Sequence, residues 1–279
     1  MENKNKIAIL TTVYNNYSIM NDFINSLKKQ NNRNFYLFIT DMSDKKEEIN
    51  LDKIDHTILF SKNKGYACGI NLGLYKAQEK GFEKFCIINN DVFFNNDFIE
   101  KLIKSLNSNP GSIIGGKIYY APGYEYHKMR YQKKDLGRVI WYAGGINDWK
   151  NAITVHRGVD EIDNNKYQNF EKTDFITGAL ILFDKDIFNR VGELDEKYFL
   201  YYEDADWCER AKKKNINLYF DPGIIMWHKV AQSTGGSGSD IHVKYQERNR
   251  IRYGLKYAPF KTKVFLLRNY FFRNFEKSQ

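Results

Sequence analysis

The sequence predicts an α/β protein with a mostly parallel sheet, helices on both faces, a small antiparallel insertion and C-terminal helices. Three observations predict it. Short apolar strands alternate with amphipathic helices over residues 1–119, glycines and tryptophans interrupt this rhythm at 120–172, and basic, aromatic helical segments end the chain. With 279 residues, 42% of them hydrophobic, the chain is long enough for one large domain with a short appendage.

The N-terminal part reads as repeated strand–helix units. An apolar, β-branched run from Lys6 to Tyr14 predicts the first strand, and apolar residues at helical spacing follow from Ser18 to Lys29. The same reasoning predicts strands at 34–40, 54–61, 84–88 and 112–119 and helices at 69–80 and 97–106. Ligands of such sheets bind at the carboxyl ends of the strands. We therefore expect a site formed by Thr11 to Asn15, Asp41 and Asn89 to Asp91.

Beyond the irregular insertion, which we expect to shape specificity, regular elements resume. The sequence predicts a strand at 174–183, a short helix from Asp184 to before Gly192, and a helix from Glu203 or Asp204 to 212–214. Acidic residues at the start of this last helix and basic ones at its end suit the helix dipole. Strands at 217–220 and 224–228 and a Ser/Gly loop at 233–239 precede helices at 243–255 and 261–275.

Charge and cysteine content limit the environment. The formal net charge is +9, and residues 241–279 hold ten Lys or Arg against two acidic residues, interleaved with aromatic side chains. Such an end suits nucleic acid, an anionic membrane face or a phosphorylated acceptor, with a solvated helix face as the alternative. Three widely spaced cysteines indicate a reducing compartment. We expect no signal peptide or transmembrane span, and a cytoplasmic protein with the option of a peripheral position on the inner membrane face.

Two acidic groups and one histidine are candidates for chemistry. Asp91, at a strand end, can bind a hard divalent cation that bridges phosphate oxygens, although Asn and Asp there also form ordinary turns. Asp204, with Glu203 and Asp206 beside it, can act as a base, or these acids only cap a helix. His228 ends a strand and is either a packed histidine or a ligand, which with Asp91 suits manganese or magnesium.

Two glycine-bearing segments are ambiguous. The loop from Lys62 to Tyr66 precedes a helix start, where backbone amides can face phosphate, but it is neither a GxGxxG nor a Walker loop and also fits a plain connection. Gly178, in Thr177-Gly178-Ala179, either contributes to a binding site or only marks a bulge in a strand.

Taken in order, these motifs resemble the inverting family two glycosyltransferases of GT-A fold, especially their rhamnosyltransferase-like branch. The resemblance runs from Ile7 to about Arg250, and its most specific part is Asn63 to Gly73. Asn89-Asn90-Asp91 stands where that family has its DxD motif, with one Asp replaced by Asn, and Glu203-Asp204 resembles its ED motif. His228 resembles a later histidine that helps bind the metal in related enzymes.

The resemblance implies roles for individual residues. The donor-binding set is Thr11, Thr12, Tyr14, Asn15, Asp41, Lys64, Gly65, Asn71, Asn89, Asn90 and Asp91. The acceptor-binding set is Thr177, Gly178, Ala179, Glu203, Asp206 and Trp207. Asp204 is the implied catalytic base, and Asp91 with His228 is the implied site for Mn²⁺ or Mg²⁺.

The resemblance also implies an activity and a domain division. Residues 1–240 would form the GT-A domain, with a nucleotide-binding half at 1–119 and an acceptor-side half at 120–240, followed by the basic helices at 241–279. The enzyme would move a sugar from dTDP-rhamnose or a UDP-hexose to a glycan or lipid-linked acceptor in cell-surface polysaccharide or glycan synthesis. The basic helices would meet an anionic membrane or form a homodimer, with no nucleic-acid partner. The alternatives are a nucleotidyltransferase and a non-catalytic nucleic-acid-binding module.

Overall fold

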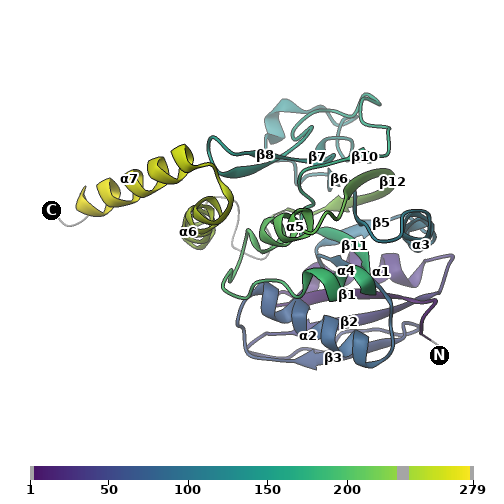
Figure 1. Cartoon of the computed structure of the whole chain (residues 1–279). Helices are drawn as coiled ribbons and strands as arrows, with labels where there is room; N and C mark the ends of the chain where they lie inside the picture. The colour runs from purple at the N-terminus through teal and green to yellow at the C-terminus, as the bar shows by residue number, and fades with distance from the viewer. Residues whose placement is uncertain (1–2, 231–238, 277–279) are drawn as a thin grey trace.

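A computed structural model describes residues 3–230 and 239–276 (Figure 1). The strands of its first part are β1 Ile7–Val13, β2 Phe35–Asp41, β3 His56–Phe60, β4 Lys84–Ile88, β5 Val92–Phe94 and β6 Ile113–Tyr120. The later strands are β7 Ile140–Tyr142, β8 Gly145–Asp148, β9 Ile153–His156, β10 Glu171–Lys172, β11 Leu180–Asp184 and β12 Leu218–His228. The α-helices are α1 Asn21–Lys28, α2 Tyr66–Glu79, α3 Phe98–Ser108, α4 Lys185–Val191, α5 Glu203–Lys213, α6 Asp240–Tyr257 and α7 Phe260–Glu276. Short 3-10 turns span Ser18–Met20 and Lys128–Arg130.

The described chain is built on a 10-stranded sheet in the order β10-β12-β6-β11-β4-β1-β2-β3, with β5 paired to β12 and β7 to β6. The run β4-β1-β2-β3 is parallel, as is the β6–β12 pair, which confirms the α/β class. Antiparallel pairing reaches further into the main sheet than predicted, because β11 runs against both β4 and β6. A parallel neighbour requires a long crossover, usually a helix, and the irregular insertion before β11 supplies no such helix.

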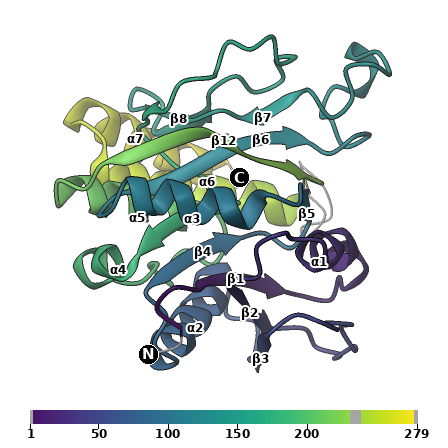
Figure 2. The same cartoon turned by 90° about the vertical axis from the view of Figure 1, so that its right-hand side faces the viewer.

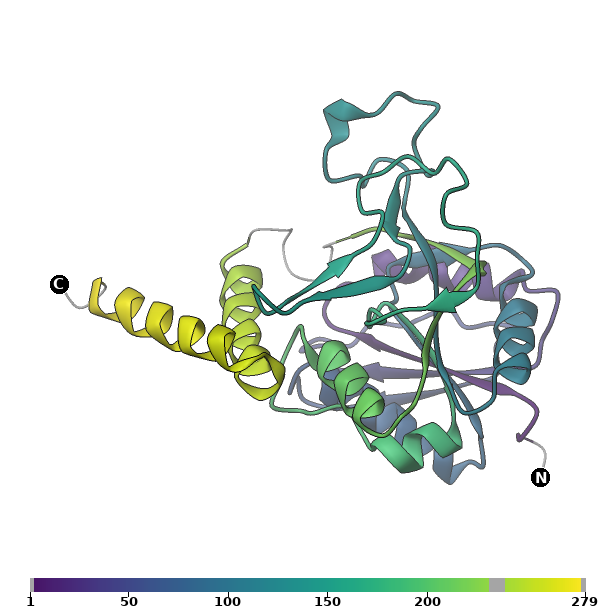
Figure 3. The same cartoon turned by 45° about the horizontal axis from the view of Figure 1, so that its top comes forward.

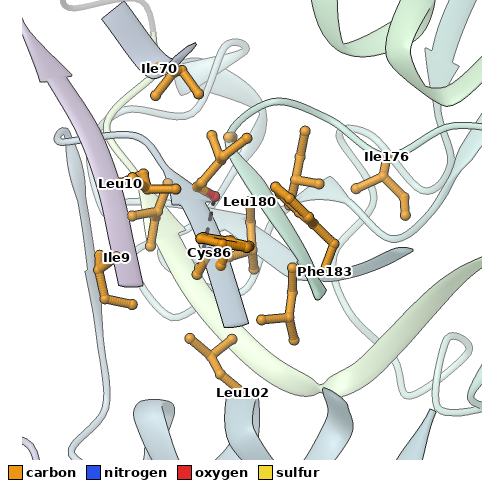
Figure 4. Close-up of a cluster of buried hydrophobic side chains, with 14 of the residues drawn as sticks. Ile9, Leu10, Ile70, Cys86, Leu102, Ile176, Leu180 and Phe183 are labelled. Carbon is orange, nitrogen blue, oxygen red and sulfur yellow. Dashed lines mark hydrogen bonds between the residues drawn. The ribbon is translucent and has the colours of Figure 1, made fainter. Parts of the chain in front are cut away.

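Helices cover both faces of this sheet. Ile70 of α2 and Leu102 of α3 lie on opposite sides of the buried strands that carry Cys86 and Leu180 (Figure 4). α2 packs so closely on β1 that a Cβ atom at Gly69 would stand 2.7 Å from the Thr12 methyl group. This close packing brings the start of α2 over the carboxyl end of β1.

Two boundaries differ from the prediction in ways that matter for the site. The two short strands predicted at 217–220 and 224–228 are one strand, β12, with a register shift between Asp221 and Ile225. The strand predicted from Asp174 begins only at Leu180, whose N–H donates to the Thr177 carbonyl across a tight turn, 3.1 Å. Gly178 therefore lies in a turn before the strand and is not a bulge within it.

The insertion and the C-terminal helices lie on one side of the sheet. The insertion rises above β6 and β12 and includes the antiparallel β8–β9 pair (Figure 2). α6 packs on α5, whereas α7 projects away from the rest of the molecule (Figures 1 and 3). The described part of α7 is anchored by Leu266, which is buried with Ala152 and Ala258. Residues 233–238 of the predicted loop lie outside the described residues.

None of the helices that the structure describes has the length and apolar character needed to cross a bilayer.

Candidate active site

The carboxyl ends of β1 and β4 are tied together by a side chain. Asn90 follows β4, and its Nδ2 donates to the Thr12 carbonyl at the end of β1, 2.9 Å. Thr11 is buried beside this link, and its hydroxyl has no hydrogen-bond partner in the described parts of the chain. The predicted meeting of these strand ends is therefore present in the structure.

Asp41 forms a second corner of the site, at the end of β2. Its carboxylate accepts hydrogen bonds from the Tyr17 hydroxyl at 2.7 Å and the Ser43 N–H at 2.9 Å, and Lys46 Nζ lies 3.3 Å away. Burial raises the pKa of Asp41, but these hydrogen bonds outweigh it, so the net pKa lies below the usual value. Asp41 is thus held as a carboxylate that can accept from a ribose hydroxyl or a base N–H.

The neighbouring loop contributes Tyr14 and Asn15. The Tyr14 hydroxyl donates to Asp44 at 3.2 Å, and Asn15, with φ of 54°, donates its backbone N–H to the Ser43 hydroxyl at 2.8 Å. Tyr14 remains exposed. The two loops that follow β1 and β2 are therefore interlocked around an accessible aromatic ring.

Asp91 and His228 meet across the site. Both residues are 4% exposed, and Asp91 Oδ1 lies 2.9 Å from His228 Nε2. Antiparallel pairing of β5 with β12 puts Val92 opposite His228, which brings the two side chains together from distant parts of the sequence. Trp141, from the insertion, stands edge-on to the imidazole with ring centroids 4.6 Å apart. The insertion thus fixes the orientation of a residue on the main sheet.

The chemistry of this pair fits a divalent cation. Within the described residues, Asp91 Oδ1 faces His228 Nε2 without forming an aligned hydrogen bond, and His228 Nδ1 is buried without a hydrogen-bond partner, so the carboxylate oxygen retains lone pairs for a metal. The Asn89 amide lies 3.4 Å from His228 Nε2. Residues 3–230 and 239–276 contain no cluster of three or more His, Cys, Asp or Glu that could hold a metal. A cation here would therefore need further ligands from a bound phosphate group.

Asp204 occupies the first turn of α5. Its Oδ2 accepts from the Gly178 N–H at 2.6 Å and its Oδ1 accepts from the Ala205 N–H at 2.8 Å. Burial raises the pKa of Asp204, and the two backbone donors lower it in part. A carboxylate fixed at both oxygens and raised in pKa is suited to take a proton from a hydroxyl.

The entry to α5 is strained. Tyr201 and Tyr202 have φ of 67° and 71°, the left-handed region that bulky residues rarely adopt. Each such residue costs roughly 1–3 kcal/mol, and such strain is concentrated at functional sites. Glu203 follows directly, and its buried Oε2 has no hydrogen-bond partner among the residues that the structure describes.

Tyr66 lies between Asn89 and Gly178, the residue that holds Asp204. Its hydroxyl lies 3.0 Å from the Gly178 carbonyl and 3.4 Å from Asn89 Oδ1. Burial raises the pKa of Tyr66 well above its usual value, and the charges of Glu203, Asp204 and Asp91 add to this. The Tyr66 hydroxyl therefore stays protonated as a donor.

The start of α2 is held against the segment before α5. Gly65 has φ of 101°, and the Tyr66 N–H donates to the Phe199 carbonyl at 2.9 Å. A Cβ atom at Gly65 would lie 2.4 Å from that carbonyl oxygen. Only glycine fits this contact. Lys64, beside it, is exposed.

Three predicted site residues lie elsewhere. Asn71 is buried and bonds to Leu194, with its Nδ2 2.9 Å from the Leu194 carbonyl. Trp207 is buried, and its indole N–H donates to the Gly192 carbonyl at 2.8 Å. Asp206 is fully buried and faces α6. Their side chains stabilise the packing of α2 and α5, and the structure does not bring them to the Asp91–Asp204 region.

Sequence reasoning missed Tyr66 and Trp141 as site residues. Tyr66 had a signal, because it starts the helix directly after the glycine loop already singled out. Trp141 had none beyond being a tryptophan in an irregular segment, because its contact with His228 depends on tertiary structure.

Comparisons with known proteins identify the family of the chain. The Glycosyl transferase family 2 profile matches residues 8–192. A dTDP-rhamnosyl transferase, RfbF of Shigella flexneri, is 25% identical over 260 residues, covering 90% of this chain and 78% of the relative. The low-salt glycan biosynthesis hexosyltransferase Agl10 of Haloferax volcanii is 26% identical over 164 residues, covering 58% of this chain and 48% of the relative.

Solved structures share the fold. GalNAc-T7, crystallised with UDP, GalNAc and Mn²⁺, superposes with a TM-score of 0.64 at 14% identity, over 87% of this chain and 48% of that one. The chain thus spans about half the length of GalNAc-T7. The mannosyltransferase PcManGT of Pyrobaculum calidifontis, in complex with GDP-Man and Mn²⁺, gives 0.53 at 13% identity, over 94% of this chain and 68% of that one. Because the profile covers more than half of the sequence, from β1 through the Asn89–Asp91 turn to α4, the protein belongs to glycosyl transferase family 2 and is a glycosyltransferase.

Proposed function

We propose that this enzyme transfers rhamnose or another hexose from a nucleoside-diphosphate donor to a hydroxyl of a glycan or lipid-linked acceptor, with inversion at the anomeric carbon. The observation that carries the proposal is the chain of contacts from Asn89 through the Tyr66 hydroxyl to Gly178, whose N–H holds Asp204. In the proposal, the phosphate-binding side and the base lie on either side of this hydroxyl. The dTDP-rhamnosyl transferase and hexosyltransferase relatives support this donor class.

Asp204 is the proposed base. It accepts the proton of the acceptor hydroxyl as that oxygen attacks the anomeric carbon, and the bond from this carbon to the diphosphate oxygen breaks on the opposite face. One displacement of this kind inverts the configuration. The backbone N–H groups of Gly178 and Ala205 hold the carboxylate in place for the attack. The Tyr66 hydroxyl and the Asn89 amide lie at the edge of the space proposed for the reacting groups, where they can donate hydrogen bonds.

The proposed donor contacts follow the strand ends. Asp41 accepts hydrogen bonds from the nucleoside, and Tyr14 offers an exposed ring beside it. Asn90 holds the ends of β1 and β4 together beneath the diphosphate. The leaving diphosphate gains negative charge as the bond breaks, so the groups around Asp91 matter most in the transition state.

Asp91 and His228 are the proposed holders of Mn²⁺ or Mg²⁺, in line with the Mn²⁺ bound in both structural neighbours. When bound, such a cation neutralises charge on the diphosphate. With one carboxylate and one imidazole, the protein relies on the donor for other ligands. We therefore expect the cation and the donor to bind cooperatively.

The test is diphosphate release and sugar transfer with dTDP-, UDP- and GDP-sugars, with and without Mn²⁺ or Mg²⁺. Asp204→Asn should lower transfer by roughly 10²-fold or more, because the base contributes about that factor. Asp186→Asn, an exposed carboxylate on α4, is the matched control and should leave transfer unchanged. The product must be a nucleoside diphosphate; release of pyrophosphate, or near-normal transfer by a folded Asp204→Asn protein, would refute the proposal.

We also propose that the C-terminal helices lie on an anionic bilayer, where lipid-linked acceptors are found. The support is the exposed apolar side chains of α7 among Lys and Arg residues, with no acidic residue between Glu247 and Glu276. In this arrangement residues 1–240 are the catalytic domain and 241–279 an interfacial appendage.

A further inference from the structure

We propose that Asn249 of α6 is a positioning residue for Asp204, acting through the backbone of residues 200 and 201. This inference rests on the proposed role of Asp204 as base. The sequence predicts α6 only as a basic, aromatic helix. The proposal gives this helix a role in positioning the base.

The side-chain amide of Asn249 donates hydrogen bonds to two backbone carbonyls. Its side chain is 1% exposed, and Nδ2 donates to the Leu200 carbonyl at 2.8 Å and to the Tyr201 carbonyl at 3.0 Å. A buried side-chain amide that donates to two successive backbone carbonyls fixes the orientation of the peptide units that carry them.

These peptide units lead directly into the base. Tyr201 and Tyr202 are the two left-handed residues before Glu203, and α5 begins at Glu203 with Asp204 next. Conformations of this kind persist only where the surrounding structure over-determines them. If the segment relaxed, the first turn of α5 would rotate and Asp204 would leave the Gly178 N–H.

Further contacts hold the same segment from two sides. On the α6 side, Tyr245 stacks on Phe199 with ring centroids 5.0 Å apart, and His242 lies edge-on to Tyr201 at 5.1 Å. On the α2 side, the Tyr66 N–H donates to the Phe199 carbonyl at 2.9 Å. Residues 199–201 are therefore held between the start of α2 and α6. We call this set of contacts the clamp, and Asn249 contributes two hydrogen bonds to it from α6.

Asn249→Asp is the sharpest variant. It preserves the shape of the side chain, but replaces the N–H donors with an oxygen that faces two carbonyl oxygens. Tyr257→Phe is the matched control, because it lies on the same helix and removes a hydrogen bond to Asp206, 2.8 Å, without touching residues 200 and 201. Both variants remove hydrogen bonds made by α6, but only the first disturbs the segment that leads to Asp204.

The experiment measures kcat and donor KM of the full chain against pH. For Asn249→Asp we expect kcat to fall roughly 10- to 100-fold, the effect of about 1 Å of misplacement, with donor KM within about twofold. The acid limb of kcat should move to lower pH, because a displaced Asp204 is better solvated and its pKa falls. Tyr257→Phe should keep the wild-type kcat and acid limb. An Asn249→Asp protein with a wild-type kcat and acid limb would overturn the proposal.

Two further readouts keep the proposal testable if Asn249→Asp is unstable or the donor is not found. In a Tyr201→Gly background, glycine adopts the left-handed conformation freely, so the kcat penalty of Asn249→Ala should shrink to a few-fold. Equal penalties in both backgrounds would contradict the clamp.

The second readout is amide exchange, which needs no assay of transfer. Exchange at residues 176–180 and 200–206 should rise in Asn249→Ala but not in Tyr257→Phe, and unchanged exchange in Asn249→Ala would contradict the clamp. If wild-type transfer does not depend on Asp204, the function is wrong; if it does and Asn249 has no effect, only the clamp is wrong.

Discussion

Glu203 lies beside the proposed base in a setting that disfavours its charge. Burial raises the pKa of this carboxyl well above its usual value, and the charge of Asp204 adds to the shift. Above pH 4.5 the unfolded chain therefore ionises at this position while the folded chain keeps its proton. The contribution of protonated Glu203 to folding stability is therefore fully present below pH 4.5, and it is lost as the pH rises toward the folded-state pKa.

We therefore predict that Glu203→Gln stabilises the protein at pH 7 by about 1–3 kcal/mol, because glutamine does not have to take up a proton on folding. The gain should vanish near pH 4, where both side chains are neutral. Urea unfolding at the two pH values measures it. Glu100→Gln, an exposed acid in the first turn of α3, serves as the control and should show no such pH-dependent gain.

Gly65 offers a second residue-scale prediction. Gly65→Ala and Gly81→Ala both place a side chain at positive φ, which costs about 1–2 kcal/mol. Only at Gly65 does the new Cβ atom also meet the Phe199 carbonyl, whereas nothing lies within 4 Å at Gly81. Gly65→Ala should therefore also lower transfer, and Gly81→Ala should lose stability alone. Equal loss of transfer in both, measured at matched folded fraction, would contradict this.

At the residue scale, the positions of the residues on strands and helices explain which inferences from the sequence the structure supports. Asp91 and His228 were expected together from their ligand chemistry and the family resemblance, and they meet because β5, which the sequence did not predict, pairs with β12. Glu203, Asp204 and Asp206 were grouped because they are adjacent in sequence. Residues two apart on a helix do not share a face, so Asp206 points to α6 while Asp204 faces Gly178.

At the scale of elements, the α5–α6 contact depends on Asp206. This carboxylate is 0% exposed and is paired with Arg210 Nε at 2.9 Å, Lys256 Nζ at 2.6 Å and the Tyr257 hydroxyl at 2.8 Å. Its partners come from both helices, so it fixes how α6 lies on α5.

We predict that Asp206→Ala lowers the free energy of unfolding by about 3 kcal/mol, since it removes one partner of a buried charge network. Asp186→Ala, whose side chain is 64% exposed and paired with Arg190 on α4, should cost about 0.5 kcal/mol or less. Denaturant titration compares the two. Similar small losses would mean that the α5–α6 contact is held by its aromatic packing alone.

The elements themselves were predictable to different degrees. Periodicity placed the first four strands and α2 correctly to within a few residues, because each is local and strongly patterned. β5 was missed, since three residues carry no period, and β12 was divided in two because Pro222 and Gly223 read as a break. Pairing with β6 and β5 on its two sides carries β12 through that interruption.

At the scale of the whole molecule, α7 projects away from the rest of the described chain (Figure 1). Phe260, Val264 and Leu267 are exposed and recur at i, i+4 and i+7, so they form one apolar stripe, with Lys261 and Arg268 beside it. A helix of this kind buries its apolar face at an anionic bilayer surface.

We predict that replacing Phe260, Val264 and Leu267 together by Ser lowers binding to phosphatidylserine-containing vesicles roughly tenfold or more, through lost apolar burial. Donor hydrolysis in solution should not change. Serine at Met129, Val155 and Val159, three exposed apolar residues of the insertion, is the matched control. Equal flotation of both triple variants would exclude the stripe, and loss of a dimer without any lipid effect would assign it to a second copy of the chain.

The contact between Asn89 and His228 joins residues 139 positions apart in the sequence. A ribosome releases the N-terminal strands first, so β1 to β4 can pair while β12 is still unmade. During that interval the nascent chain has Asp41 and Asp91 but no imidazole beside Asp91, and the β12-facing edge of β6 is open to other strands. The Asp91–His228 pair therefore forms late in translation, at the step in which β12 also covers that edge.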